Sequence, residues 1–212
     1  MGAGVAGAAG VLAFYRALAI GTMSVISPII AVQVIVPVTV GLLLGERPAV
    51  LAYLGMVLAV GGIVLVSASK GRGGVRVPTA AILLAILTAA CFGTMLVGLD
   101  VGGQASPYWA VFDARVASAG IILVYFVASR RRLDLTARAV PALVLVGLFL
   151  TVANTLFTVA TTMGYLSIVS ILGSLSAVVT TSLAQVLLHE RLSARQWAAV
   201  GAVLVGVVML TV

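Results

Sequence analysis

Long apolar runs, separated by short polar or glycine-rich segments, occupy almost the whole chain. A helix needs about 20 mainly apolar residues to cross the roughly 30 Å hydrocarbon core of a bilayer. Eight runs meet this requirement to within a few residues, and we predict membrane-spanning helices over 2–20, 23–44, 49–68, 78–98, 107–128, 140–161, 165–188 and 196–212. Backbone groups cannot stay unpaired in lipid, so helices are the structure that fits such runs. The pattern therefore predicts an all-α membrane protein.

The segments between the runs have the character of membrane loops. Residues 69–76 and 129–134 are basic, and 101–107 is rich in turn-forming residues. The ends of the fifth predicted helix carry aromatic residues, whose amphipathic rings favour the membrane interface: Tyr108, Trp109 and Tyr125. The Gly and Ala content of the first helix is typical of a membrane helix that packs closely against its neighbours.

Composition supports the same prediction. Hydrophobic residues make up 63% of the chain and charged residues 8%, whereas about 25% of a soluble domain is charged. Charges this sparse cannot cover a globular surface in water, so the outer surface must face lipid. The net charge of +7 comes from basic residues that sit singly or in short loop clusters, which argues against a nucleic-acid partner. We expect the anionic neighbour to be the lipid headgroups.

One stretch of the sequence occurs twice, at 21–66 and again at 164–210. Each copy consists of an apolar run, a Glu-Arg turn and a second apolar run, with the turns at Glu46-Arg47 and Glu190-Arg191. Before the turns, one glycine and two serines recur at the same spacing: Gly21, Ser24 and Ser27 in the first copy, Gly164, Ser167 and Ser170 in the second. Such self-similarity indicates duplication, and in an apolar chain it indicates the repeat-built folds of membrane transporters.

Polar side chains line one face of each of two predicted helices. On the helix at 165–188 they recur at spacings of 3, 4, 7 and 4 residues: Ser167, Ser170, Ser174, Thr181 and Gln185. On the helix at 140–161 the spacings are again three and four: Thr151, Asn154, Thr158 and Thr161 or Thr162. Two facing stripes would line a cavity. Alternatively, the hydroxyls join neighbouring helices through hydrogen bonds worth about 1 kcal/mol each.

Amides are stronger candidates than hydroxyls, because a buried amide needs several partners and costs more when it is unpaired. Asn154, Gln185 and also Gln33, in the helix at 23–44, are therefore candidates for cavity lining. The hypothetical substrate-binding set combines the amides with the polar stripes: Gln33, Asn154, Thr158, Ser167, Ser170, Ser174 and Gln185.

Prolines and charges inside predicted spans suggest further roles. Pro28 and Pro37 each remove a backbone donor from the helix at 23–44, and they mark either a hinge or a static kink. Asp113 and Arg115 are the only opposite charges close together within a span, so they are candidates for proton or substrate coupling. Asp113 would lie only about 9 Å into its helix, so snorkelling to the interface is the alternative.

Motifs for catalysis or metal binding are absent from the sequence. It has no phosphate loop and no nucleophile elbow, and His189 is its one histidine, so a zinc protease motif cannot form. An intramembrane enzyme would need paired catalytic groups at depth, which one Asp beside one Arg does not supply. We predict a protein that is not an enzyme and that uses no cofactor or metal.

Several segments resemble a known family. The segments 14–21, Ser27-Pro28, Leu42-Leu43-Leu44-Gly45-Glu46-Arg47 and 61–65 look like the later part of an EamA-type repeat, which defines many members of the drug/metabolite transporter superfamily. Residues 188–193, with Gln196-Trp197 after them, resemble the same place in the second repeat. The resemblance implies ten helices in two inverted five-helix halves around a central cavity that opens alternately to each side.

The chain departs from that pattern, because only three predicted helices precede the second half. We therefore expect 1–69 to be an incomplete first repeat of three helices, apparently lacking the first two of the family. Residues 70–77 would be a basic loop, and 78–212 a second repeat of five helices. The predicted fold is an all-α membrane protein of about eight transmembrane helices from two inverted repeats, the first incomplete.

The resemblance implies a multi-pass carrier of small metabolites or drugs in the cell membrane, acting as an exporter by alternating access. Its partners would be membrane lipid and a small-molecule substrate, with no nucleic acid. The alternative is a truncated, non-transporting membrane protein, or a partial bundle that needs a partner chain or a homo-oligomer.

Overall fold

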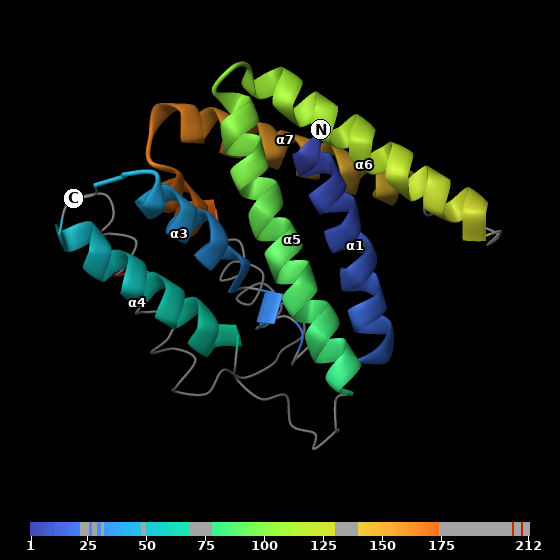
Figure 1. Ribbon diagram of the computed structural model, residues 1–212, viewed down its shortest axis with the longest axis horizontal. Coiled ribbons are helices and arrows are strands. Elements are labelled where there is room, and N and C mark those ends of the chain that lie inside the picture. The colour runs from blue at the N-terminus through green and yellow to red at the C-terminus, as the bar shows by residue number, and fades with distance from the viewer. Residues whose placement is uncertain are drawn as a thin grey trace.

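Helices make up the regular structure of the part of the chain that the computed structural model describes, which is 1–21, 26, 29–30, 32–47, 50–67, 78–129, 140–173, 205 and 209. The elements, shown in Figure 1, are α1 (Gly2–Ile20), the 3-10 turn η1 (Val32–Val34), α3 (Ile35–Leu43), α4 (Val50–Ser67), α5 (Thr79–Gly103), α6 (Pro107–Ser129) and α7 (Val140–Met163). A further helical segment covers 166–173. Within these residues, α1, α5, α6 and α7 are long and apolar enough to cross a membrane, which confirms the predicted fold class.

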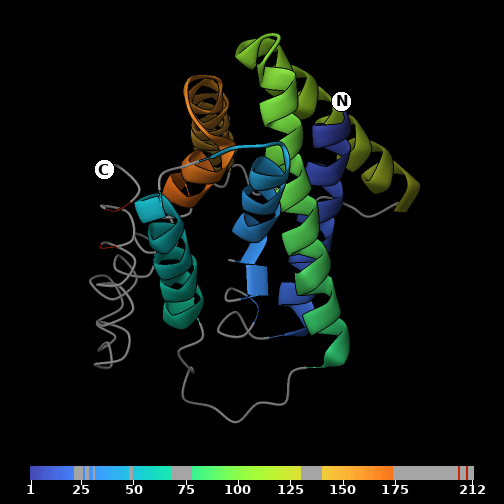
Figure 2. The same ribbon diagram turned by 60° about the vertical axis from the view of Figure 1, so that its left-hand side comes forward.

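Helix α5 is the centre of the described bundle, because it contacts α1, α3, α6 and α7. Figures 1 and 2 show α1 alongside α5, α6 leaving the end of α5 at a steep angle, and α3 on the other side of α5 from α1. Helix α4 lies outside α3, at the edge of the described structure.

The spans predicted at 2–20, 49–68, 107–128 and 140–161 agree with the structure to within a few residues, whereas the span at 78–98 was predicted too short. Most of the spans predicted at 165–188 and 196–212 lies outside the described residues. Helix α5 continues past residue 98 to Gly103, so that part of the predicted 101–107 link is helical. The chain then turns through Gln104–Ser106, where backbone N–H groups bond back to Asp100 and Gly102. Pro107 begins α6, at the position where its missing N–H costs nothing. Asp100 consequently belongs to a helix and not to a loop.

The span predicted at 23–44 is interrupted. Residues 32–34 form the 3-10 turn η1 before α3 begins. Pro37 has no N–H with which to bond the carbonyl of Gln33, so the regular helical ladder cannot run through this point. The freed Gln33 oxygen faces Gly93 of α5, where a Cβ atom would lie only 2.7 Å from it. The irregular backbone at η1 thus packs directly against Gly93 of α5.

Helix α3 ends in the turn that the sequence repeats. Gly45 has a φ of 95°, which favours glycine, and it follows the last helical turn. The N–H of Glu46 bonds to Gly41 O at 3.1 Å and the N–H of Gly45 bonds to Leu42 O at 3.2 Å. This pair of bonds is a Schellman helix end, and it fixes the direction in which Glu46 leaves the helix.

Small residues bring α1 against its neighbours, as its composition predicted. The buried face of α1 consists of glycines and alanines: Ala3, Gly4, Gly7, Ala8, Gly10, Ala13 and Ala17. A Cβ atom on Gly4 would lie 2.6 Å from Ala117 Cβ of α6, and a Cβ atom on Gly98 of α5 would lie 2.9 Å from Ala3 Cβ. The Ser118 hydroxyl of α6 donates to Gly4 O at 2.7 Å. Close backbone approach, together with this one polar bond, holds the α1, α5 and α6 core together.

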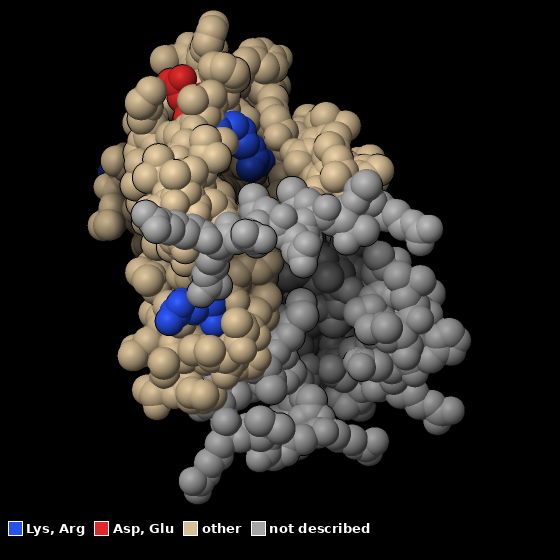
Figure 3. All heavy atoms as spheres, turned by 90° about the vertical axis from the view of Figure 1, so that its right-hand side faces the viewer, with Lys and Arg blue, Asp and Glu red and all other residues tan. Residues whose placement is uncertain are grey.

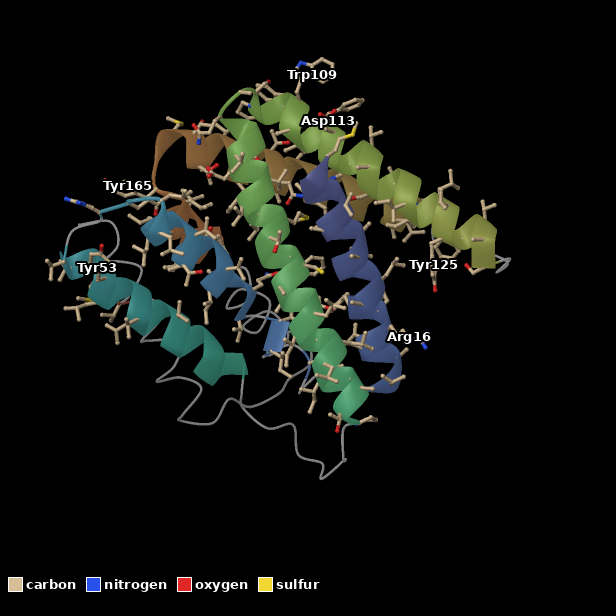
Figure 4. All side chains as sticks on the ribbon, viewed as in Figure 1. Arg16, Tyr53, Trp109, Asp113, Tyr125 and Tyr165 are labelled. Carbon is tan, nitrogen blue, oxygen red and sulfur yellow. The ribbon has the colours of Figure 1, made fainter. Side chains whose placement is uncertain are left out.

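The outside of the bundle is apolar. Large hydrophobic side chains are exposed on every long helix, and in α7 all residues from 140 to 150 are exposed. Figure 3 shows one face on which the described atoms are almost all uncharged. Trp109 and Asp113 lie near the start of α6, and Arg16 lies near the far end of α1 (Figure 4). This distribution is that of a surface that faces lipid.

Candidate functional site

Six polar or charged side chains are buried in the described structure: Thr88, Asp100, Thr158, Thr161, Ser167 and Ser170. Three of them, Thr158, Ser167 and Ser170, belong to the predicted substrate-binding set. They come from α7 and from the helical segment 166–173, which follows α7 after a short turn. Burial of so many polar groups between apolar helices marks this region as the candidate site.

The strongest polar interaction in this region joins the two copies of the repeat. The Glu46 carboxylate lies at the N-terminal end of the 166–173 helix and accepts bonds from two backbone N–H groups, Leu166 at 2.6 Å and Ser167 at 3.1 Å. It also bonds the Ser167 hydroxyl. The first N–H groups of a helix have no partner within the helix and carry a partial positive charge. A carboxylate from the first copy therefore caps a helix of the second.

Gly41 provides the space for this cap. A Cβ atom at Gly41 would lie 2.5 Å from a carboxylate oxygen of Glu46. Any larger residue would therefore push the carboxylate away from the helix end. The Schellman turn, the glycine one turn earlier and the acid together form one unit, which we call the Glu46 cap.

Ser170 lies three residues after Ser167, on the same side of the 166–173 helix. It is 2% exposed, and its hydroxyl has no hydrogen-bond partner among the described residues. The neighbouring Ile171 packs with Val34 of η1, in an apolar cluster with Val38, Val60 and Ile168. Ser170 thus places a hydroxyl without a described partner beside the contact of the 166–173 helix with η1, α3 and α4.

The threonine hydroxyls of α7 bond mainly to their own helix. Thr158 Oγ1 donates to Asn154 O at 2.8 Å, and Thr161 Oγ1 donates to Thr158 O at 3.0 Å. These donors are therefore not available to a ligand, although the oxygen atoms can still accept. The methyl group of Thr158 packs against Gly103 of α5, where a Cβ atom would lie only 2.5 Å away.

The two described amides of the predicted substrate-binding set lie on elements that both contact α5. Gln33 is half-buried on η1, and Asn154 is half-buried on α7. Pro37, the described member of the predicted hinge pair, is buried in α3. Pro28 of the predicted hinge pair lies outside the described residues, as do three residues of the polar stripe predicted at 165–188: Ser174, Thr181 and Gln185.

Asp113 and Arg115 are both half-buried on α6, and no ion pair joins them. Residues two apart on a helix point in different directions. Two nitrogens of the Arg115 guanidinium, Nε and Nη2, are buried without a hydrogen-bond partner among the described residues.

Sequence reasoning missed two acidic residues. Glu46 was placed in a turn without a role, because its partners are 120 residues away and no local pattern links them. Asp100 was placed outside a helix, because Gly102 and Gly103 suggested a loop. It is only 8% exposed and accepts a bond from Gln104 Nε2 at 3.3 Å. The four-residue spacing of Asp100 and Gln104 was the signal that the helix continues.

Comparison with known proteins agrees with this architecture. A solved protein crystal structure superposes with a TM-score of 0.82 at 17% sequence identity, over 99% of this chain and 74% of that chain. At this identity the likeness shows the fold alone. A comparison with curated protein sequences finds no match. The family model for the EamA-like transporter family matches residues 79–212, which is more than half of the chain. The protein belongs to the EamA-like transporter family.

Proposed function

We propose that the protein is a carrier that moves small metabolites or drugs across the cell membrane by alternating access, and that it exports them. The family match carries this proposal, since it identifies a transporter of the drug/metabolite type. The division into an incomplete first repeat at 1–69, a loop at 70–77 and a second repeat at 78–212 is part of the proposal.

We place the substrate path between η1 and α3 on one side and α7 with the 166–173 helix on the other. Ser170 supports this placement, because a buried hydroxyl that has no partner among the described residues costs free energy that a polar solute or water would recover. Asn154 and Gln33 would supply amide contacts from α7 and η1. A path with few charges and several hydroxyl and amide groups suits polar or amphipathic solutes.

The sequence has no phosphate loop, so an ion gradient or solute exchange would drive transport. We assign Asp113 to coupling as the acid nearest the start of α6, and Pro37 to a hinge beside the path. Both assignments follow from their chemistry within membrane helices.

Flux into proteoliposomes tests the proposal. The purified protein should accumulate or exchange at least one solute from a panel of amino acids, other metabolites and cationic drugs, above the rate of empty vesicles. Asn154→Leu should lower that flux while the amount of folded protein is kept. The matched control is Thr162→Val on the exposed side of α7, whose hydroxyl bonds to Val159 O. Flux that Asn154→Leu leaves unchanged would remove Asn154 from the path.

A partial bundle completed by another chain is the second candidate. The observation in its favour is the complete exposure of residues 140–150 of α7, which are apolar on every side. Lipid or a second helix could cover them. Measuring the protein mass in detergent distinguishes a cover of lipid from a cover by a second copy of the chain. A stable homo-oligomer would give a multiple of the 21.5 kDa chain mass.

A further inference from the structure

Arg115 carries a positive charge that the described structure leaves without a counter-ion. Its Nε and Nη2 atoms are buried, and neither has a hydrogen-bond partner in the part of the chain that the structure describes. These two nitrogens lie on the same edge of the guanidinium group and point their N–H bonds in parallel. That edge is the fork with which arginine binds two oxygens of one carboxylate or phosphate group.

None of the described acids forms an ion pair with Arg115. Glu46 caps the 166–173 helix, and Asp100 accepts from Gln104. Asp113 lies two residues from Arg115 and makes no ion pair with it. The described protein therefore offers this cation no anion.

Within the described structure, no side chain on the same side of α6 bonds to Nε or Nη2 of Arg115 either. One turn before Arg115 is Val111, which is 3% exposed and packs with Ala3 and Leu99. Almost one turn after it is Ser118, whose hydroxyl donates to Gly4 O. Burying a charged donor without a hydrogen-bond partner costs free energy. An oxyanion that accepts bonds from both nitrogens would recover that free energy on binding.

Arg115 lies well inside α6 and not at its end. It is eight residues beyond Pro107, which is about 12 Å along the helix axis. Arg16 differs from Arg115, because its side chain is exposed near the C-terminal end of α1. A long side chain snorkels when its charged head reaches water. The two buried nitrogens of Arg115 show that its fork stays within the protein.

We propose that Arg115 binds an oxyanion, either a carboxylate or a phosphate, through two parallel hydrogen bonds from Nε and Nη2. The oxyanion belongs to an amphipathic solute or to a lipid headgroup, because the same fork fits both. If the solute is the cargo, the substrate class of the proposed carrier is an organic anion, and that step rests on the proposed function. Binding itself does not depend on transport.

Thermal unfolding of the full chain in dodecyl maltoside, which contains no phosphate, tests the proposal. Hexanoate and hexyl phosphate are the soluble probes, hexanol is the neutral control, and short-chain phosphatidic acid is the lipid probe. At least one anionic probe should raise the unfolding temperature saturably, whereas hexanol should not. Saturation by hexanoate and hexyl phosphate indicates a solute site, and a response to phosphatidic acid alone indicates a headgroup site.

Three variants separate this site from general charge effects. Arg115→Met should unfold at a higher temperature than the parent without probes, because it removes an unpaired buried charge, and should lose the probe response. Arg115→Lys keeps the charge without the fork and should bind about tenfold more weakly. Arg16→Gln should respond like the parent. The proposal is overturned if no anionic probe stabilises the parent, or if Arg115→Met keeps the response. A binding response without flux in proteoliposomes would contradict the carrier and leave the oxyanion site standing.

Discussion

Removing the Glu46 cap should destabilise the protein by an amount that its bonds allow us to work out. The carboxylate accepts bonds from the backbone N–H groups of Leu166 and Ser167 and from the Ser167 hydroxyl. Each hydrogen bond to a charged group contributes about 1.5–3 kcal/mol when it is well shielded. Glu46 is half-buried, so water competes, and substitutions at a helix N-cap cost about 0.5–2 kcal/mol. We expect Glu46→Ala to cost about 2–4 kcal/mol of unfolding free energy.

Two partial substitutions should give intermediate values. Glu46→Gln loses the charge and one acceptor oxygen, and should cost about 1–2 kcal/mol. Ser167→Ala removes the hydroxyl bond alone and should cost about 1 kcal/mol. The control is Arg47→Gln, an exposed change in the same turn, which should stay within about 0.5 kcal/mol of the parent. Equilibrium unfolding in dodecyl maltoside micelles with rising SDS fraction measures all four.

Gly41→Ala makes the test specific to this geometry. The added methyl group would displace the carboxylate, so the substitution should be destabilising in the parent. In a Glu46→Ala background there is no carboxylate to displace, and the same change should cost little. A coupling of about 1 kcal/mol or more between the two sites is expected. Additive effects, or a Glu46→Ala cost equal to that of Arg47→Gln, would refute the cap as a stabilising joint between the two copies.

Four other substitutions test packing, the path and the hinge. Gly4→Ala should cost about 1–3 kcal/mol by overpacking against α6, whereas Gly120→Ala, with open space around it, should be neutral or stabilising by up to about 1 kcal/mol in the same unfolding assay. Ser170→Ala should keep or raise the unfolding temperature, because the hydroxyl has no partner, and should lower flux in proteoliposomes; unchanged flux would exclude Ser170 from the path. Pro37→Ala should stabilise the protein and slow flux if Pro37 is a hinge, whereas a static kink predicts that flux is unchanged.

Apolar run length was sufficient to predict where most helices lie, because lipid leaves the backbone few alternatives. The predicted helix boundaries were wrong where the same residue type occurs both in loops and within helices. Gly102 and Gly103 resemble a loop, yet they lie within α5, where Gly103 gives the methyl group of Thr158 room to approach. Pro37 indicated a perturbed helix, but not that the 3-10 turn would lie at 32–34 and face Gly93.

The candidate site was harder to predict, because its contacts span the two copies of the repeat. The duplication aligned Glu46 with Glu190 and Ser167 with Ser24, and this alignment says which residues correspond, not which residues touch. The bond between Glu46 and Ser167 crosses 121 residues. The spacing of the α7 threonines predicted a polar stripe, but spacing alone could not show that the Thr158 and Thr161 hydroxyls donate to carbonyl groups of their own helix.

Aqueous accessibility of Ser170 tests most directly whether a polar path runs between the two copies. Cys91, the chain's one cysteine, is first replaced by alanine, and single cysteines are then introduced as Ser170→Cys in the path and Leu148→Cys on the exposed apolar side of α7. A membrane-impermeant thiol reagent is applied to proteoliposomes, and labelling is followed by mass spectrometry. We predict slow labelling at position 170, as the carrier opens, and none at position 148, which faces lipid. Absence of labelling at position 170 from either side of the membrane would contradict the carrier.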